Sequence, residues 1–251
     1  MENQALVFSY ILVMGTIGLS WLNQMHLEKE IILSSLRATG QLIVAGFLLT
    51  VIFEIEQIEI FSFILLFMCL VAARISGGRG KEIPSSYSIA FVGILIGSLL
   101  PFTLLCIVGV IQMDARFMIP LGGMVIGNSM KASSVALNRL VAEVGHQRSQ
   151  IETLLSLGAS VRQAARTVIT PAIKAGLIPT LDTMKSVGLV HLPGIMTGYI
   201  IAGGDPMTAV KFQLAIIYML AGTSGLTCLV VTLLAYKKCF NKQLQLRLLE
   251  S

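Results

Sequence analysis

Residues 151–171 read IETLLSLGASVRQAARTVITP, and long apolar runs lie on both sides of this stretch. Its apolar residues recur at helical spacing before and after the tripeptide GAS. Gly158 can adopt the left-handed conformation that ends a helix, and Ser160 with Gln163 fits the capping box that begins the next one. The stretch therefore predicts a helix, a sharp turn and a second short helix that ends near Pro171.

The composition places this helical insert in a membrane protein. Of the 251 residues, 55% are hydrophobic and 12% are charged, and the mean hydropathy is +0.84. A soluble domain has about a quarter charged residues, so we expect one integral membrane domain over residues 1–251. The first apolar run is long and no basic segment precedes it, which favours a retained helix over a cleaved signal peptide. The four cysteines are scattered without a CxxC pair, which predicts neither a disulfide framework nor a thiolate metal site.

The apolar runs predict an all-α, polytopic helical bundle. A bilayer crossing needs roughly 20 mostly apolar residues. Seven segments qualify, of which the sixth is interrupted by Pro193 and several glycines, and the boundary between the second and third is poorly defined. The seven expected spans are 6–25, 38–56, 58–75, 88–112, 117–137, 187–204 and 208–236. Three GxxxG pairs, which allow close helix packing in lipid, lie in the fourth, fifth and sixth spans at Gly93/Gly97, Gly123/Gly127 and Gly194/Gly198.

The distribution of charge predicts the orientation in the membrane. Most of the 18 basic residues fall in the first, third and fifth connections and in the C-terminal tail. By the positive-inside rule the N-terminus lies outside, and the C-terminus and the fifth connection, residues 139–186, are cytoplasmic. The net charge of +5 then reflects topology and contact with membrane lipid. No combination of aromatic and basic residues predicts a nucleic-acid partner.

Two interpretations of the 151–171 insert compete. An amphipathic hairpin on the inner leaflet would suit its basic residues and apolar stripe. The alternative is a docking element, because the spacing of Glu152, Gly158 and Pro171 resembles the EAA loop of ABC-transporter membrane subunits. Thr153, Leu154 and Thr170 depart from that pattern, and Val168 stands where isoleucine is usual. The resemblance implies a coupling helix in a groove of a separate ATPase, with these docking residues: Glu152, Gly158, Ala159, Ser160, Arg162 and Pro171.

No motif in the sequence indicates an ATPase site. The nearest candidate, ISGGRGKEIP at residues 75–84, departs from the phosphate-binding pattern GxxxxGK[ST] at Ile75 and Glu82. No strand precedes it, so a basic cytoplasmic turn is the better interpretation. We therefore expect a subunit that is not itself an enzyme and binds no cofactor, with ATP and Mg²⁺ on the partner.

Three stretches together carry a family resemblance: GMVIGNSM at 123–130, the insert, and GLVHLPGIMTGYIIAGGDPMTAVKFQL at 188–214. From about residue 117 to 240 the chain resembles the FetB-type iron-export permease family, which includes plant relatives linked to aluminium tolerance. The resemblance implies an ABC permease in the cell membrane that works as a homodimer with two cognate cytosolic ATPase subunits. It also implies export of iron or a related metal ion, which composition and periodicity alone do not indicate.

Polar residues inside the spans are candidates for the substrate pathway. A central lysine costs about 2.5–3.5 kcal/mol on insertion scales, so Asn128, Ser129 and Lys131 qualify, although Lys131 could instead snorkel to the inner interface. Pro193 and Gly194 break the sixth span, where exposed backbone could line a cavity. His191 and Met196 could ligate a transiting metal. An ordinary packing histidine and a space-filling methionine are the simpler interpretations of these last two.

Other functions remain open at this point. An ABC importer permease for another small solute would carry the same loop. An intramembrane enzyme is disfavoured because the spans hold no His/Glu cluster and no GxSxG motif. A structural scaffold would leave the capped insert unexplained.

Asp205-Pro206 is expected to cap the seventh span, with a weak external metal site as the alternative.

Overall fold

The computed structural model describes residues 3–52, 58–111, 114–241 and 245–246. Within these residues the regular structure is helical and no strand is formed, which confirms the all-α prediction. The chain divides into two compact units, residues 1–56 and 57–251. The boundary expected between the second and third spans, around residues 53–57, lies outside the described part of the chain.

The first unit is a helical hairpin of α1 (Asn3–Leu22) and α2 (Glu28–Ile52). Its turn is fixed by the buried Ser20, whose hydroxyl donates to Glu28 Oε1 at 2.8 Å and accepts from the Leu27 amide at 3.2 Å. Along both helices the described apolar side chains are largely exposed, as for Leu12 and Phe47. Exposed apolar helix faces of this kind belong in a lipid or protein environment.

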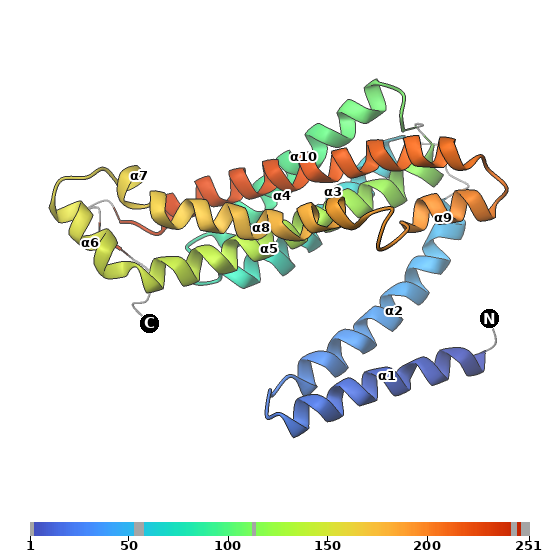
Figure 1. Cartoon of the computed structure of the whole chain (residues 1–251), viewed down its shortest axis with the longest axis horizontal. Coiled ribbons are helices and arrows are strands. Elements are labelled where there is room, and N and C mark those ends of the chain that lie inside the picture. Colours follow the sequence, from blue (N-terminus) through green and yellow to red (C-terminus); the bar gives the residue numbers. More distant parts are fainter. Residues whose placement is uncertain (1–2, 53–57, 112–113, 242–244, 247–251) are drawn as a thin grey trace. The chain divides into compact units, whose positions relative to one another are not determined.

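The second unit is a bundle of five long helices, α3, α4, α5, α8 and α10, with short helices at its ends (Figure 1). The bounds are α3 Ile58–Gly77, η1 Gly78–Gly80, α4 Ser86–Ile107, α5 Ala115–His146, α6 Arg148–Ser156, α7 Val161–Ala164, α8 Arg166–Ser186, α9 Gly194–Ile201 and α10 Pro206–Lys238. Helices α6 and α7 lie at one end of this bundle, and α9 lies at the opposite end (Figure 1).

The expected sixth span is wrong. The structure places α8 in the bundle, where Val168, Ala172, Gly176 and Thr180 are buried. Residues 187–204 instead form a connection that contains the eight-residue helix α9, which is too short to cross a bilayer. Hydropathy misassigns the two segments because α8 carries charged residues and two prolines, whereas residues 187–204 contain no acidic or basic side chain except a histidine.

The expected limits of the fifth connection change with this correction. Helix α5 continues past the predicted residue 137 to His146, and the second helix of the insert does not end at Pro171, because α8 runs through it to Ser186. The connection between the two long helices is therefore residues 147–165 rather than 139–186. Lys174 belongs to a bundle helix, and Lys185 lies at the α9 end.

Seven helices in the described residues still have 20 or more residues: α1, α2, α3, α4, α5, α8 and α10. In the part of the chain that the structure describes, four segments are both long and apolar enough to cross a membrane: Glu28–Thr50, Glu59–Gly80, Ser86–Ile107 and Pro206–Lys238. Helices α5 and α8 have the length but are more polar. The chain is thus a multi-pass helical membrane protein.

Small residues bring α4 and α10 into close contact. A Cβ added at Gly93 would lie 2.1 Å from Val231 Cγ2, and one at Gly97 would lie 2.0 Å from Thr227 Oγ1. The first GxxxG pair therefore forms a helix interface. Gly176 has the same role in α8, where an added Cβ would lie 2.4 Å from Cys228 Sγ. The third pair, in the α9 segment, has no neighbour within 4 Å of an added Cβ and forms no such interface.

Candidate functional site

The turn between α6 and α7 is built by local hydrogen bonds, as the sequence predicts. Gly158 has φ +87°, the left-handed conformation. Its amide donates to the Leu155 carbonyl at 3.0 Å and the next amide donates to the Leu154 carbonyl at 3.0 Å, which closes α6 in a Schellman motif. Ser160 caps α7 in a complete capping box with Gln163.

The inner face of this turn packs into the bundle. Ile151, Ala164, Ala165 and Val168 are fully buried and belong to the same apolar core as Leu140 of α5. The apolar stripe of the insert is therefore used against the protein, and it is not free to lie on a lipid surface. The turn is held by the core as well as by its own caps.

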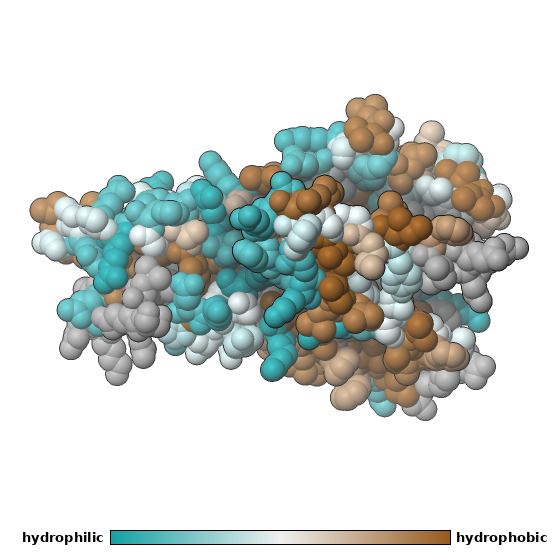
Figure 2. All heavy atoms as spheres, turned by 90° about the horizontal axis from the view of Figure 1, so that it is seen from below, coloured by the Kyte–Doolittle hydropathy of each residue, from teal (hydrophilic) through white to brown (hydrophobic). Residues whose placement is uncertain are grey.

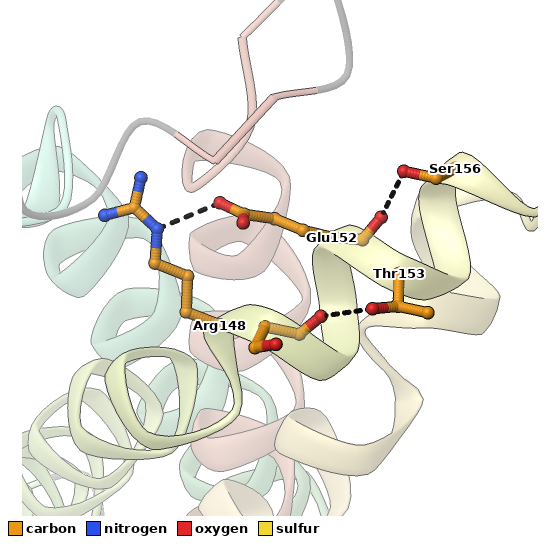
Figure 3. A network of polar contacts seen from close by, with 5 residues as sticks. Arg148, Glu152, Thr153 and Ser156 are labelled. Carbon is orange, nitrogen blue, oxygen red and sulfur yellow. Dashed lines mark hydrogen bonds and ion pairs between the residues drawn. The ribbon is translucent and has the colours of Figure 1, made fainter.

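The outer face of the turn is exposed and mostly polar. It comprises Glu152, Thr153, Ser156, Gly158, Ser160, Arg162 and Gln163, with the apolar Leu157 79% exposed at the tip. Arg148 Nε donates to Glu152 Oε1 at 2.9 Å, and the Ser156 hydroxyl donates to the Glu152 carbonyl at 2.9 Å (Figure 3). Figure 2 shows the hydrophilic character of this end of the molecule, at the left of the view.

The predicted docking residues divide between two places. Glu152, Gly158, Ser160 and Arg162 lie together on the exposed turn, and Ala159 lies half-buried within it. Pro171 is half-buried inside α8, one and a half turns beyond the start of that helix, and is not part of the exposed face.

A second polar region lies inside the bundle, where α5, α8 and α10 meet. Asn128 Nδ2 donates to the Leu220 carbonyl at 3.1 Å and to Ser224 Oγ at 2.6 Å, and Ser224 Oγ is 2.8 Å from Thr180 Oγ1. Nearby, Thr227 Oγ1 donates to Ser129 Oγ at 3.1 Å. We call these five residues of three helices the polar seam. Its hydrogen bonds join helices within the membrane domain.

The polar seam contains two of the predicted pathway residues, Asn128 and Ser129, and three that the sequence reasoning missed. Ser224 and Thr227 are spaced three apart on α10 and share a helix face, which is a signal that could have indicated them. Thr180 gives no such signal, because its partner is 44 residues away. Lys131 does not join the seam and is exposed on α5.

The remaining predicted residues lie in the connection that contains α9. Pro193 and Gly194 begin this short helix, Met196 is half-buried, and the exposed His191 ring has Nδ1 3.3 Å from Ser186 Oγ. The described residues contain no group of three or more His, Cys, Asp or Glu side chains that could hold a metal ion. The structure thus brings neither His191 nor Met196 to the polar seam.

Asp205 caps α10, as expected. Its carboxylate accepts from the Thr208 amide and from the Thr208 hydroxyl, both at 2.8 Å. These hydrogen bonds stabilise the charged form and lower the pKa of Asp205 below its ordinary value.

Comparison with known proteins identifies the family. Residues 3–240 match the model of an uncharacterised protein family, UPF0014. The chain is 37% identical to the UPF0014 membrane protein YjkA of Bacillus subtilis, over 98% of this chain and 99% of that protein. It is 37% identical to the probable iron export permease protein FetB of Escherichia coli, over 97% of this chain and 94% of that protein. It is also 35% identical to the protein ALUMINUM SENSITIVE 3 of Arabidopsis thaliana, over 94% of this chain and 87% of that protein.

No solved structure matches the chain. The family match covers almost the whole sequence, and the relatives align over nearly their full lengths. The chain therefore belongs to the UPF0014 family of membrane proteins.

Proposed function

We propose that this protein is the membrane-spanning permease subunit of an ABC transporter that exports iron or a related metal ion. ATP hydrolysis takes place on a separate ATPase subunit, which carries ATP and Mg²⁺ and docks on the turn between α6 and α7. Two permeases and two ATPases form the working unit. The assignment of iron as the substrate is supported by the similarity to a relative that is named as a probable iron export permease.

The observation that carries the proposal is the anchored, outward-facing α6–α7 turn. A docking element has to present an exposed surface and also resist deformation when a partner moves it. The turn meets both conditions, because Leu157 and Glu152 are exposed while Ile151 and Ala165 are fully buried. A loose surface loop would meet only the first condition.

The basic residues support a cytoplasmic position for this end. Arg148 and Arg162 lie in the connection itself, and Lys237 and Lys238 end α10 at the same end of the bundle. Positive charge accumulates on the cytoplasmic side of membrane proteins. The ATPase is in the cytoplasm, so the turn faces its partner.

The connections to the long helices are short enough to transmit a displacement. Only Gln147 separates α5 from α6, and only Ala165 separates α7 from α8. A push on the turn therefore acts on α5 and α8 together. Helix α8 in turn meets α10 at the contact between Thr180 and Ser224 in the polar seam. Closure of the ATPase would in this way change the packing of α5, α8 and α10, where the predicted pathway residues Asn128 and Ser129 lie.

The test compares total metal in iron-loaded cells by elemental mass spectrometry. The strains are wild type, a deletion, and the deletion restored with the native chain, with Leu157→Asp or with Leu189→Asp. Both leucines are highly exposed, at 79% and 90%, so neither substitution disturbs a core. Leu157 lies between α6 and α7 and Leu189 lies between α8 and α9, and these two connections are at opposite ends of the bundle, which makes Leu189→Asp the matched control.

We expect excess iron in the deletion and in the Leu157→Asp strain, and normal iron with the native chain and with Leu189→Asp. Normal iron with Leu157→Asp would show that the tip of the turn is not needed for docking. Equal iron in all strains would remove iron as the substrate.

A further inference from the structure

The exposed faces of the bundle helices differ in polarity at the same depth. The contacts Ser76–Ser133, Ser129–Thr227 and Gly97–Thr227 align α3, α4, α5 and α10 at one level. Near this level the exposed side chains of α4 and α10 are apolar, since Ile96 and Leu229 are 42% and 45% exposed, whereas α3 exposes Ile75 beside Arg74. Apolar exposed residues of this kind face lipid.

Helices α5 and α8 present a different surface. The exposed stripe of α5 carries Lys131, Val135 and Asn138, beside the half-buried Ser134. The exposed stripe of α8 carries Thr167, Thr170 and Lys174 in its first half, and Ile178 and Leu181 in its second half. Polar stripes on membrane-spanning helices face a water-filled cavity or another protein chain rather than hydrocarbon.

The two lysines lie at nearly the same level. A Cβ added at Gly176 would lie 2.8 Å from the Ala132 carbonyl oxygen, so α5 and α8 touch at this point. Lys131 is the residue before Ala132, and Lys174 is two residues before Gly176. Both lysines are therefore within one helical turn of the same contact.

Lys131 lies partway along the bundle rather than at its end. Leu137 of α5 packs against Gly80, in the turn between α3 and α4. Lys131 is six residues deeper, which is about 9 Å along a helix. The α5 stripe has no large apolar side chain in the turn beyond Lys131. Gly127 has no neighbour within 4 Å of an added Cβ, and Asn128 is only half-buried. A lysine that only snorkels to headgroups would be followed by apolar residues at greater depth. Lys131 is not followed in this way, whereas on α8 the exposed Ile178 and Leu181 come after Lys174.

In the described part of the chain, no ion pair balances the positive charge of either lysine. Arg139 pairs with Glu143, and Lys185 Nζ is 3.6 Å from Asp182 Oδ1. Among the residues that the structure describes, no carboxylate lies within ion-pair distance of Lys131 or Lys174. Two uncompensated ammonium groups repel a bare metal cation and attract an anion.

We propose that the exposed stripes of α5 and α8 line the inner mouth of the translocation path, where Lys131 and Lys174 bind an anionic group of the cargo. The inference rests on the proposed transport function and specifies the chemical class of the substrate. Iron passes this point as a complex with a carboxylate- or phosphate-bearing ligand, and not as bare Fe²⁺. Lysine is a suitable point charge for both groups.

The test measures binding to the purified full-length chain in nanodiscs of phosphatidylcholine, which carries no net charge. The probes are iron(III) citrate and Fe²⁺ without a chelator, in isothermal titrations. The variants are Lys131→Gln, Lys174→Gln, the double glutamine variant and the double arginine variant. Lys237→Gln, at the end of α10, is the control for loss of one exposed positive charge.

We expect the native chain to bind iron citrate more tightly than Fe²⁺, and each lysine-to-glutamine change to weaken citrate binding roughly tenfold. The arginine variant should retain binding because it keeps both charges, and Lys237→Gln should bind as the native chain does. Tighter binding of Fe²⁺, or unchanged citrate binding in the double glutamine variant, would overturn the proposal. Loss of citrate binding in nanodiscs with one-third phosphatidylglycerol would assign the lysines to lipid headgroups and would also overturn it.

Iron content of the cells separates this proposal from the transport function. We expect iron to accumulate with the double glutamine variant and to remain normal with the double arginine variant. If the glutamine variant exports iron as well as the native chain does, and Leu157→Asp does not, the permease function stands and the anionic cargo is excluded. If the deletion strain accumulates no iron, iron is removed as the substrate, whatever the lysine variants do.

Discussion

The two ends of the bundle use the same local chemistry but are anchored differently. At one end Gly158, with φ +87°, and the Ser160 cap form the turn between α6 and α7. At the other end Gly203, with φ +89°, and the Asp205 cap form the turn into α10. The first turn places fully buried residues in the core, whereas α9 has no buried residue at all. Only the anchored end is able to pass a displacement to the long helices.

The largest expected effect tests this difference in anchoring directly. Ile151 is fully buried and Ile195 is 41% exposed, so we compare the same truncation to alanine at both positions. Ile151→Ala removes buried methylene groups and leaves a cavity, which costs about 2–5 kcal/mol. Ile195→Ala should cost less than about 1 kcal/mol, because its side chain is only partly removed from its surroundings on folding. Thermal unfolding in one detergent, followed by circular dichroism, measures both.

Equal losses of stability at the two positions would contradict the comparison. They would mean that α9 is held as firmly as α6. Because both variants are isoleucine-to-alanine changes in helices, the difference in helix propensity cancels between them.

The turn between α6 and α7 could be predicted from sequence because its structure is locally encoded. Gly158, Ser160 and Gln163 specify the helix end, the turn and the next helix start through bonds between near neighbours. The prediction failed one step further, at Pro171, where a helix end was expected. Proline is tolerated inside membrane helices, and α8 continues through both Pro171 and Pro179.

The α9 end could not be predicted in the same way. Hydropathy measures how readily a whole segment partitions into lipid. It therefore does not detect a membrane helix that packs one face against protein and carries polar residues on another face. Helix α8 is of this kind, with Gly176 and Thr180 against its neighbours and Lys174 exposed. Only two of the five residues of the polar seam were predicted, because the pairing of Ser224 with Thr180 depends on the register between helices that are distant in sequence.

An intermediate effect distinguishes the role of the two glycine turns. Gly158→Ala and Gly203→Ala both place a Cβ in open space, so only the left-handed backbone opposes them. Each should cost about 1–2 kcal/mol of stability. We expect only Gly158→Ala to reduce the amount of ATPase subunit that co-purifies with the tagged chain in mild detergent.

Gly198→Ala is the control for adding a methyl group, since Gly198 is helical and also has open space around it. It should stabilise α9 by roughly 0.5–1 kcal/mol. A loss of ATPase with Gly203→Ala equal to that with Gly158→Ala would show that general destabilisation, and not docking, explains the effect.

A smaller effect is expected from the cap of α7. Ser160→Ala removes the side-chain oxygen that accepts from the Gln163 amide, and should cost about 1 kcal/mol. Ser160→Asp keeps an acceptor at the cap and serves as the matched variant. The unfolding temperature should fall for alanine and recover for aspartate. An unchanged temperature for Ser160→Ala would mean that the core contacts of Ala164 and Ala165 hold the turn without its cap.

The smallest effect concerns the dependence of the two caps on pH. The amide and hydroxyl of Thr208 lower the pKa of Asp205 in the folded protein, so the unfolded chain binds a proton more readily. The stabilisation by this carboxylate is complete above the ordinary aspartate pKa of about 3.9 and is lost as the pH falls through the lowered value. Asp205→Asn should therefore lower the unfolding temperature at pH 7, and the difference from the native chain should shrink below about pH 4. Ser160→Ala should show the same difference at both pH values, because a serine hydroxyl does not titrate. If Asp205→Asn also gave a pH-independent difference, the Asp205 carboxylate would not be the charged cap of α10, and the two ends would be capped by equivalent neutral contacts.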